Sequence, residues 1–223
     1  MKEFQRMQLF YRTSGAFFVS AVGRRLQKQI KTFFADDILE KLPVIFIGSV
    51  SPFLAVFEQN NPDIVWESET LNESELLPTF SSFREISAVF MVVSNDSVAD
   101  NMPFLLKEAY RLLKPQGRLH LLIKNKLPVT FIKIKDMPEM QPSSLLAQSE
   151  ESGFSLEKKK GLLYLPYNFK FFETADNCLS ERFSGGGSFS LLTLKKNPVI
   201  AETTENYSSI RMTKASVLTS PRT

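Results

Sequence analysis

The residues with the clearest chemical potential surround a glycine that follows a short apolar run. Gly48 ends the run at residues 44–47, and Ser51 is followed directly by Pro52. A serine before a proline is typical of a helix start, where the hydroxyl caps the first turn and proline takes the first helical position. The unpaired N–H groups of such a turn favour an anionic part of a ligand, and glycine allows close approach to the backbone. This turn is therefore the first candidate binding site.

Two acidic residues follow this turn at the spacing of a nucleoside-binding site. Glu67 lies 19 residues after Gly48, and Glu69 lies 21 residues after it. A carboxylate about 20 residues beyond the glycine, at the end of the next strand, is placed to accept hydrogen bonds from ribose hydroxyls. The alternative is that both glutamates are merely solvated beyond the strand end, and the residues themselves leave both interpretations open.

The counts of cysteine and histidine restrict the chemistry further. The 223 residues include one cysteine, Cys178, and one histidine, His120. A disulfide within the chain and a cysteine-rich zinc site are excluded, and any histidine-dependent triad would have to use His120. Because Leu119 and Leu121 flank His120 in an apolar run, we predict that it is a packed strand residue. The net charge of +3 is too small to indicate nucleic-acid binding by itself.

The elements that would position these residues follow from the periodicity of apolar side chains. Short apolar runs are typical of strands buried on both faces, and three- to four-residue spacing is typical of helices. Their alternation predicts an α/β fold with a Rossmann-like, doubly wound, mostly parallel sheet. Strands are predicted at residues 44–47, 63–66, 86–93, 118–123, 154–165 and 188–194, and helices at residues 14–34, 51–57, 101–113, 143–151 and 169–183.

The N-terminal region is predicted to hold an amphipathic helix and no targeting signal. Arg24 and Arg25 directly follow the short apolar run at residues 16–22, which lacks the cleavage pattern of a secretory signal. No apolar stretch reaches the roughly 20 residues that a membrane-spanning helix needs. We therefore expect a cytoplasmic protein whose first helix covers the core, with a membrane-surface helix as the alternative. The residues that share the apolar face of this helix are Phe18, Val22, Leu26, Ile30 and Phe33.

Three polar or glycine-rich stretches are assigned no chemistry. The lysines at residues 158–160 are expected to form a solvated strand end rather than a binding patch. No helix follows the glycines at residues 185–187, as a phosphate loop requires, so they are expected to form a flexible connection. Residues 197–223 hold few large apolar groups and are expected to be a disordered tail, which leaves one domain over residues 1–196.

One segment resembles a known family. The Leu-Lys-Pro-Gly-Gly-Arg-Leu segment of class I S-adenosylmethionine (SAM)-dependent methyltransferases, which joins a helix to the fifth strand of a seven-stranded sheet, is similar to Leu112-Leu113-Lys114-Pro115-Gln116-Gly117-Arg118-Leu119-His120-Leu121-Leu122. Residues 10–11 and 44–54 are similar to a subgroup of small bacterial methyltransferase-domain proteins. The resemblance covers about residues 10–196, and it implies a seven-stranded sheet whose last strand is antiparallel.

The glycine turn departs from the pattern of that family. The family has an acidic residue followed by Gly-x-Gly-x-Gly, whereas this chain has Phe46 at the acidic position, Gly48 at the first glycine, and Val50 and Pro52 at the other two. Side chains at Val50 and Pro52 narrow the space that the methionine part of the cofactor would use. Residues 94–96 lack the Asn/Asp-Pro-Pro-aromatic signature of enzymes that methylate amino groups of bases or glutamine.

The resemblance implies SAM as cofactor and assigns roles to particular residues. Gly48, Ser49 and Ser51 would contact its amino-acid end, Glu67 its ribose, and Asn95 would lie beside the adenine or the methyl acceptor. No catalytic residue and no metal ligand is assigned, because the sulfonium already makes the methyl group electrophilic and positioning supplies much of the catalysis. A small-molecule acceptor is expected because no added recognition domain is evident, and the oligomeric state is left open.

Two other functions remain open at this point. The altered glycine turn favours a methyltransferase-like module that has lost its cofactor and acts through protein contacts. A nicotinamide-dependent dehydrogenase would also use Gly48 and Glu67, although the Lys-Pro-x-Gly-Arg segment argues against it. Titration with each cofactor distinguishes the three.

Overall fold

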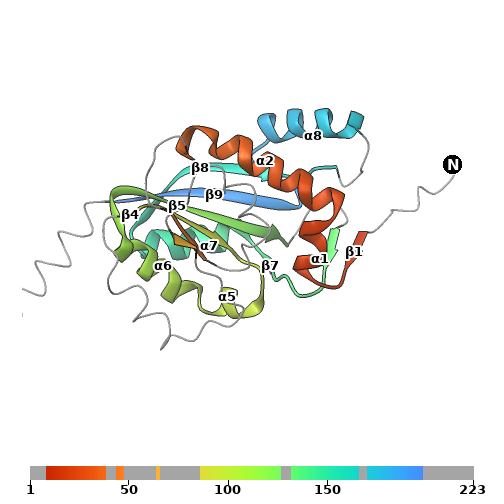
Figure 1. Ribbon diagram of the computed structural model, residues 1–223. Helices are drawn as coiled ribbons and strands as arrows, with labels where there is room; N and C mark the ends of the chain where they lie inside the picture. Colours follow the sequence, from red (N-terminus) through yellow and green to blue (C-terminus); the bar gives the residue numbers. More distant parts are fainter. Residues whose placement is uncertain are drawn as a thin grey trace, which may run out of the picture.

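The computed structural model describes residues 9–38, 44–47, 64–65, 86–126, 132–165 and 170–197, and it places a central sheet between two layers of helices (Figure 1). One face of the sheet carries α1 (Ser14–Val19), α2 (Ala21–Ile38) and α8 (Lys170–Arg182). The opposite face carries α5 (Asp96–Asp100), α6 (Met102–Leu112) and α7 (Pro142–Glu151).

The sheet has the strand order β3-β2-β4-β5-β9-β8. The strands β3, β2, β4 and β5 are parallel, and β9 runs antiparallel to both of its neighbours. The doubly wound, mostly parallel sheet with an antiparallel last strand is thus confirmed. A two-residue strand, β7, also pairs with β5, and residues 66–85 lie outside the described part, so the implied count of seven strands stays a prediction. The strands are β2 (Val44–Ile47), β3 (Ile64–Val65), β4 (Ile86–Val92), β5 (Leu113–Asn125), β7 (Glu139–Met140), β8 (Phe154–Leu162) and β9 (Phe189–Lys196).

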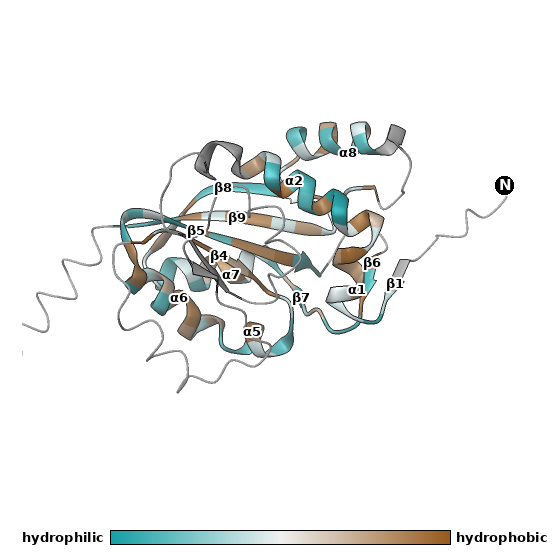
Figure 2. Cartoon of the chain, viewed as in Figure 1, coloured by the Kyte–Doolittle hydropathy of each residue, from teal (hydrophilic) through white to brown (hydrophobic). Residues whose placement is uncertain are grey.

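Alternate side chains of the strands build a separate core on each face, as the period of two in a strand requires. On β4, Val89 and Met91 belong to the core under α6, whereas Phe90 and Val92 belong to the core under α1 and α2. Figure 2 shows the resulting hydrophobic colouring along β4, β5 and β9. The apolar residues buried under α6 are Leu105, Leu106, Ala109 and Leu112 of the helix and Leu113 at the start of β5.

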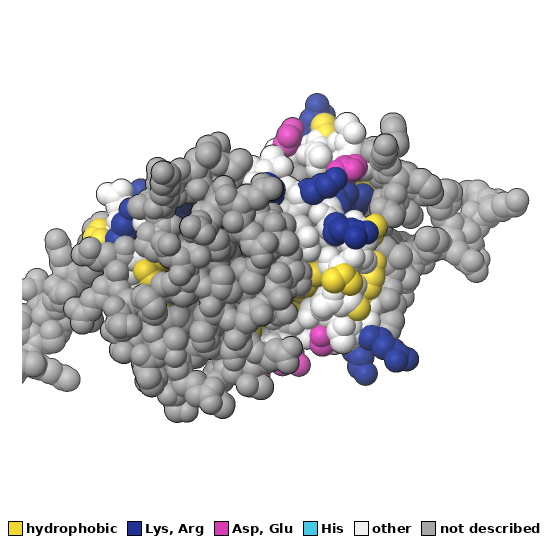
Figure 3. Space-filling model, in the orientation of Figure 1, with side chains coloured by type: hydrophobic (Ala, Val, Ile, Leu, Met, Phe, Trp, Pro, Cys, Tyr) yellow, Lys and Arg dark blue, Asp and Glu magenta, His cyan; other side chains and the backbone are white. Residues whose placement is uncertain are grey.

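The predicted helix at residues 14–34 consists of two helices that meet at Ser20. Ser20 has an extended backbone (ψ 164°), and its hydroxyl accepts a hydrogen bond from the N–H of Gly23 at 3.1 Å. From there α2 packs on the sheet with Val22, Leu26 and Ile30 buried, which confirms the core-covering interpretation. Figure 3 shows Lys and Arg side chains gathered over the outer side of this helical layer. Among the described helices, none is both long and apolar enough to cross a membrane.

The Lys-Pro-Gln-Gly segment, predicted to lie between α6 and the next strand, belongs to the start of β5. Ile86 pairs with Leu113 and Ala88 with Arg118, so β5 carries extra residues opposite a short stretch of β4. Gln116 has φ 65°, and an added Cβ at Gly117 would lie 2.9 Å from a backbone carbonyl oxygen. The segment is therefore a bulge at the helix–strand junction, where Gly117 allows the tight turn.

A second, two-stranded sheet lies beside the main one and was not expected from the sequence. Strand β1 (Leu9–Tyr11) pairs in parallel with β6 (Ile132–Ile134). The N–H and the hydroxyl of Ser14 both donate to Asp136 Oδ2, at 2.9 and 3.3 Å. The N-terminal segment is thereby fastened to the segment that follows β5.

Two interpretations of local runs are corrected by the structure. Residues 158–160 lie within β8, which continues to Leu162, so they are not a strand end, and Lys158 Nζ lies 4.4 Å from the centroid of the Phe33 ring. The predicted flexible connection at residues 185–187 is closely packed at its last residue, Gly187, whereas Gly185 is exposed. Gly186 has φ 95°, and an added Cβ at Gly187 would collide with the backbone of Leu162. The chain therefore makes a tightly packed turn here.

The remaining predicted elements agree with the structure where it describes them. The helix predicted at residues 143–151 is α7, followed by Gly153 at φ 93°, and the helix predicted at residues 169–183 is α8. The backbone of Asn197 bonds to Gly153 and to the Tyr110 hydroxyl. The predicted helix at residues 51–57 and the predicted disordered tail beyond Asn197 lie outside the described residues, so the domain boundary stays a prediction.

Candidate functional site

The candidate site lies where the order of the strands reverses. From β2 the chain passes to β3 on one side, and it returns to β4 on the other. Ile47, the last residue of β2, is the register partner of Met91, so the carboxyl ends of β2 and β4 are adjacent. In open α/β sheets, ligands bind beyond the carboxyl ends of the strands at such a switch point.

Four of the five predicted binding residues are not placed by the structure. Gly48, Ser49, Ser51 and Glu67 lie outside the described residues, as do Val50 and Pro52 of the altered turn. Their roles stay predictions.

Asn95 is the fifth, and it lies at the carboxyl end of β4 as predicted. Its Oδ1 accepts a hydrogen bond from the N–H of Val98 at 2.9 Å, and its carbonyl accepts one from Ala99 at 3.2 Å. The backbone is extended at φ −151° and ψ 171°, as an N-cap residue requires. The side-chain oxygen is thus used to start α5.

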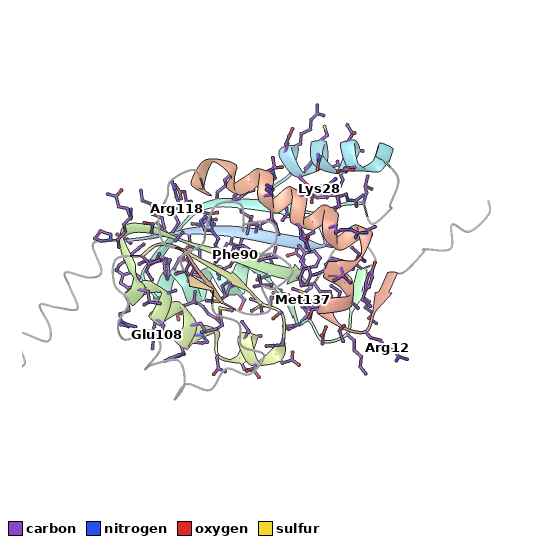
Figure 4. All side chains as sticks on the ribbon, viewed as in Figure 1. Arg12, Lys28, Phe90, Glu108, Arg118 and Met137 are labelled. Atoms are coloured by element: carbon purple, nitrogen blue, oxygen red, sulfur yellow. The ribbon has the colours of Figure 1, made fainter. Side chains whose placement is uncertain are left out.

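Strand β5 runs past the end of β4 at this edge of the sheet. Val92, the last residue of β4, pairs with Leu122, and the N–H of Val93 still donates to Leu122 at 3.0 Å. Beyond that point β7 pairs with β5 in parallel, with Glu139 opposite Lys124. Because β9 occupies the other side of β5 up to Lys124, β7 lies on the side of β4, beyond its end. In Figure 4, Arg118 marks the amino-terminal half of β5, and Met137 lies near the carboxyl end of the strand.

The last two residues of β5 bring buried polar groups to this edge. Lys124 has a side chain that is 3% exposed, and its Nζ lies 2.8 Å from Oε1 of Glu139, which is 40% exposed. Asn125 donates from Nδ2 to the carbonyl of Gly187 at 2.6 Å, and within the described chain its buried Oδ1 has no hydrogen-bond partner. A cation and an amide therefore lie one strand away from Asn95.

His120 lies elsewhere, in the middle of β5. It is 2% exposed, and its Nδ1 is 3.1 Å from the Thr193 hydroxyl of β9. Burial, together with the positive charge of Arg118, lowers the pKa of His120 from 6.5 to about 3. The prediction that His120 is a packed strand residue is confirmed.

Comparisons with known proteins bear on this fold. No family model matches the sequence, and no curated protein matches it. Among solved structures, the CcbJ methyltransferase from Streptomyces caelestis aligns with a TM-score of 0.51 at 11% identity, over 79% of this chain and 98% of its own. The chain has the class I methyltransferase fold. SAM-dependent methyltransferases from Thermotoga maritima and Mesorhizobium loti match with TM-scores of 0.48 and 0.49, at 17% and 10% identity, over 81% and 80% of this chain and 93% and 99% of theirs.

The resemblance of the sequence to class I methyltransferases implies SAM as cofactor, and the described residues can be compared with that expectation. The adjacent ends of β2 and β4 provide the expected place, and Asn95 stands at its edge with its oxygen committed to the α5 cap. The other contacts would come from the turn after β2, which is outside the described residues. The described part thus matches the cofactor in position, at the adjacent ends of β2 and β4.

Lys124 and Glu139 were not predicted as site residues from the sequence. Lys124 follows the apolar run of β5, which indicates that it lies at the strand end, but nothing in the sequence indicates that it is buried. Its burial depends on β7, a two-residue strand without recognisable periodicity. Only the topology brings Glu139 to it.

Proposed function

We propose that this chain is a SAM-dependent methyltransferase that acts on a small-molecule acceptor. The observation that carries the proposal is the switch point between β2 and β4 within a sheet of methyltransferase topology, with Asn95 at the end of β4. The CcbJ structure, itself a methyltransferase, supports the same fold. When bound, SAM supplies an electrophilic methyl group.

The contribution of this chain is to bind and orient. Gly48, Ser49 and Ser51 offer backbone N–H groups and hydroxyls to the amino-acid end of the cofactor, and Glu67 accepts from the ribose hydroxyls. Asn95, at the end of β4, lies beside the adenine or the acceptor. Alignment of the acceptor with the methyl group then supplies much of the rate enhancement, since holding two reactants in place removes an entropic cost.

Calorimetric titration of the full chain with SAM and S-adenosylhomocysteine (SAH) tests this function. We expect submillimolar binding of both, and loss of binding in Gly48→Asp, because the added carboxylate would fill the turn and repel the cofactor carboxylate. Gly15→Ala is the matched control, since an added Cβ at Gly15 meets nothing within 4 Å. This control should bind like the wild type.

Two outcomes would contradict the proposal. Well-folded protein that binds neither SAM nor SAH would indicate a module that has lost its cofactor, as the side chains at Val50 and Pro52 suggest. Binding of NAD in a parallel titration, without SAM, would indicate a dehydrogenase.

A further inference from the structure

Lys124 makes few hydrogen bonds for a buried cation. An ammonium group has three N–H donors. Among the described residues, the one acceptor of Lys124 is Oε1 of Glu139 at 2.8 Å, which accounts for one donor. A buried donor without an acceptor is costly, the more so on a charged group. The ammonium therefore has capacity to bind further oxygen atoms.

A pair of stacked aromatic rings borders Lys124 on the side of β9. Its register partner on β9 is Phe189, which stacks on Phe17 of α1 with 5.4 Å between the ring centroids. Both rings are 0% exposed. These rings offer no oxygen atom to the ammonium group.

Glu139, the ion-pair partner of Lys124, is partly exposed to solvent. Its side chain is 40% exposed, and it belongs to a two-residue strand that pairs with the last two residues of β5. Glu139 is therefore the solvent-accessible member of the ion pair. If another anion replaces Glu139, the charge of Lys124 remains neutralised. The free-energy cost of releasing the Glu139 carboxylate to water is small, because that carboxylate is already partly solvated.

The place of Lys124 connects it to the candidate site. It lies two residues past Leu122, which pairs with the end of β4, and this is about 7 Å at the usual rise of a strand. Asn95 leaves the sheet at the same edge. We propose that Lys124 is the counter-charge for an anionic group, a carboxylate or a phosphate, of the methyl acceptor, and that this group takes the place of Glu139. The assignment to the acceptor rests on the proposed function.

The test uses small anions as probes and thermal unfolding of the full chain as readout. Sodium acetate and inorganic phosphate are compared with sodium chloride at equal ionic strength, and acetamide serves as the neutral counterpart of acetate. Glu139→Gln removes the competing carboxylate and keeps a polar group beside Lys124. We expect acetate or phosphate to raise the Tm of this variant by about 3–5 °C at ten times the Kd. A larger Tm increase with acetate than with phosphate indicates a carboxylate site, and the reverse indicates a phosphate site. Acetamide should not raise the Tm.

Three comparisons make the result specific to Lys124. In the wild type the shift should be smaller, because Glu139 competes. The increase in Tm should vanish in Lys124→Met and in the double variant Lys124→Met/Glu139→Gln. If Lys124→Met does not fold, Lys124→Gln takes its place. Glu157→Gln is the matched control at the amino end of β5, because it frees Arg118 from an exposed pair of 2.7 Å. Its shift should not exceed that of the wild type.

The outcomes separate this inference from the proposed function. Equal shifts with and without Lys124, or no shift in Glu139→Gln, would overturn the inference and show a structural ion pair. SAH titration of Lys124→Met should equal that of the wild type, since Lys124 serves the acceptor. Absence of SAH binding in every variant, together with a Lys124-dependent shift, would overturn the proposed function and leave an anion site at Lys124.

Discussion

Asp176 on α8 and Arg25 on α2 form a buried ion pair, with 3.2 Å between Oδ2 and Nε and with side chains that are 0% and 7% exposed. The carboxylate also accepts hydrogen bonds from the N–H groups of Tyr164 and Leu165, at 2.6 and 3.0 Å. Gln29 of α2 donates to it at 3.1 Å. One side chain thus joins α2 and α8 to the chain that follows β8. Burial raises the pKa of Asp176, and the positive charge of Arg25 opposes that shift.

Asp176→Asn tests how much this pair stabilises the fold. The variant keeps an oxygen for the backbone N–H groups but removes the carboxylate charge that lies 3.2 Å from the buried Arg25 guanidinium. We expect a loss of about 3–5 kcal/mol in the free energy of unfolding, measured by urea denaturation. Lys28→Met is the matched control, because it breaks the exposed Lys28–Glu173 pair between the same two helices. Its cost should be at most about 1 kcal/mol, and equal losses in the two variants would contradict the argument.

His120 predicts a specific dependence of stability on pH. Its pKa is lowered to about 3 in the folded chain, so the unfolded chain binds a proton below about pH 6.5 while the folded chain does not. The stability that the neutral His120 contributes is therefore fully present above about pH 6.5. This contribution decreases as the pH falls toward about 3, by about 1.4 kcal/mol per pH unit.

The variant His120→Gln isolates this contribution. Glutamine can still bond to the Thr193 hydroxyl and does not titrate. Urea denaturation between about pH 4 and pH 5.5 should give a pH slope for the variant that is shallower than the wild-type slope by about 1.4 kcal/mol per unit. Carboxylates titrate equally in both proteins and cancel in the difference. Parallel curves would mean that His120 is protonated in the folded state.

The sequence predicted those elements that are defined by the spacing of apolar side chains a few residues apart. The spacing of Val22, Leu26 and Ile30 places three side chains on one helix face, and all three are buried. Asn95 lies beyond the end of a predicted strand, as expected, although α5 and its cap by Asn95 were not predicted. The apolar periodicity that fixed the strand and the helix face is local, so sequence alone was sufficient for them.

Long-range pairing was not predicted, because no local pattern encodes it. Gln29 and Asp176 are 147 residues apart, and Ser14 and Asp136 are 122 residues apart. The strands β1, β6 and β7 are two or three residues long, too short for an alternating pattern to be recognised. The Lys124–Glu139 contact depends on one of them, so that part of the site could be found only in the structure.

The turn before β9 predicts a difference between two neighbouring glycines. An added Cβ at Gly187 collides with the backbone of Leu162, which cannot move aside, whereas at Gly185 it meets only the Nζ of Lys159 at 3.9 Å. Gly187→Ala should therefore destabilise the fold by about 1–3 kcal/mol, as overpacking does, and Gly185→Ala by less than about 0.5 kcal/mol. Thermal unfolding of both variants measures the difference. A tolerant Gly187 would show that the turn is as loose as its sequence suggested.

Asn95 allows its structural role to be separated from contact with a ligand. Asn95→Ala removes the oxygen that accepts from Val98 and should cost about 1 kcal/mol of stability. Asn95→Asp keeps that acceptor, so its stability should equal the wild type, but it replaces the amide donor by a second oxygen. If the amide donates to the cofactor, SAH titration should show affinity lowered about tenfold in Asn95→Asp. Unchanged SAH affinity in this stable variant would restrict Asn95 to capping α5, and the adenine contact would then have to come from another residue.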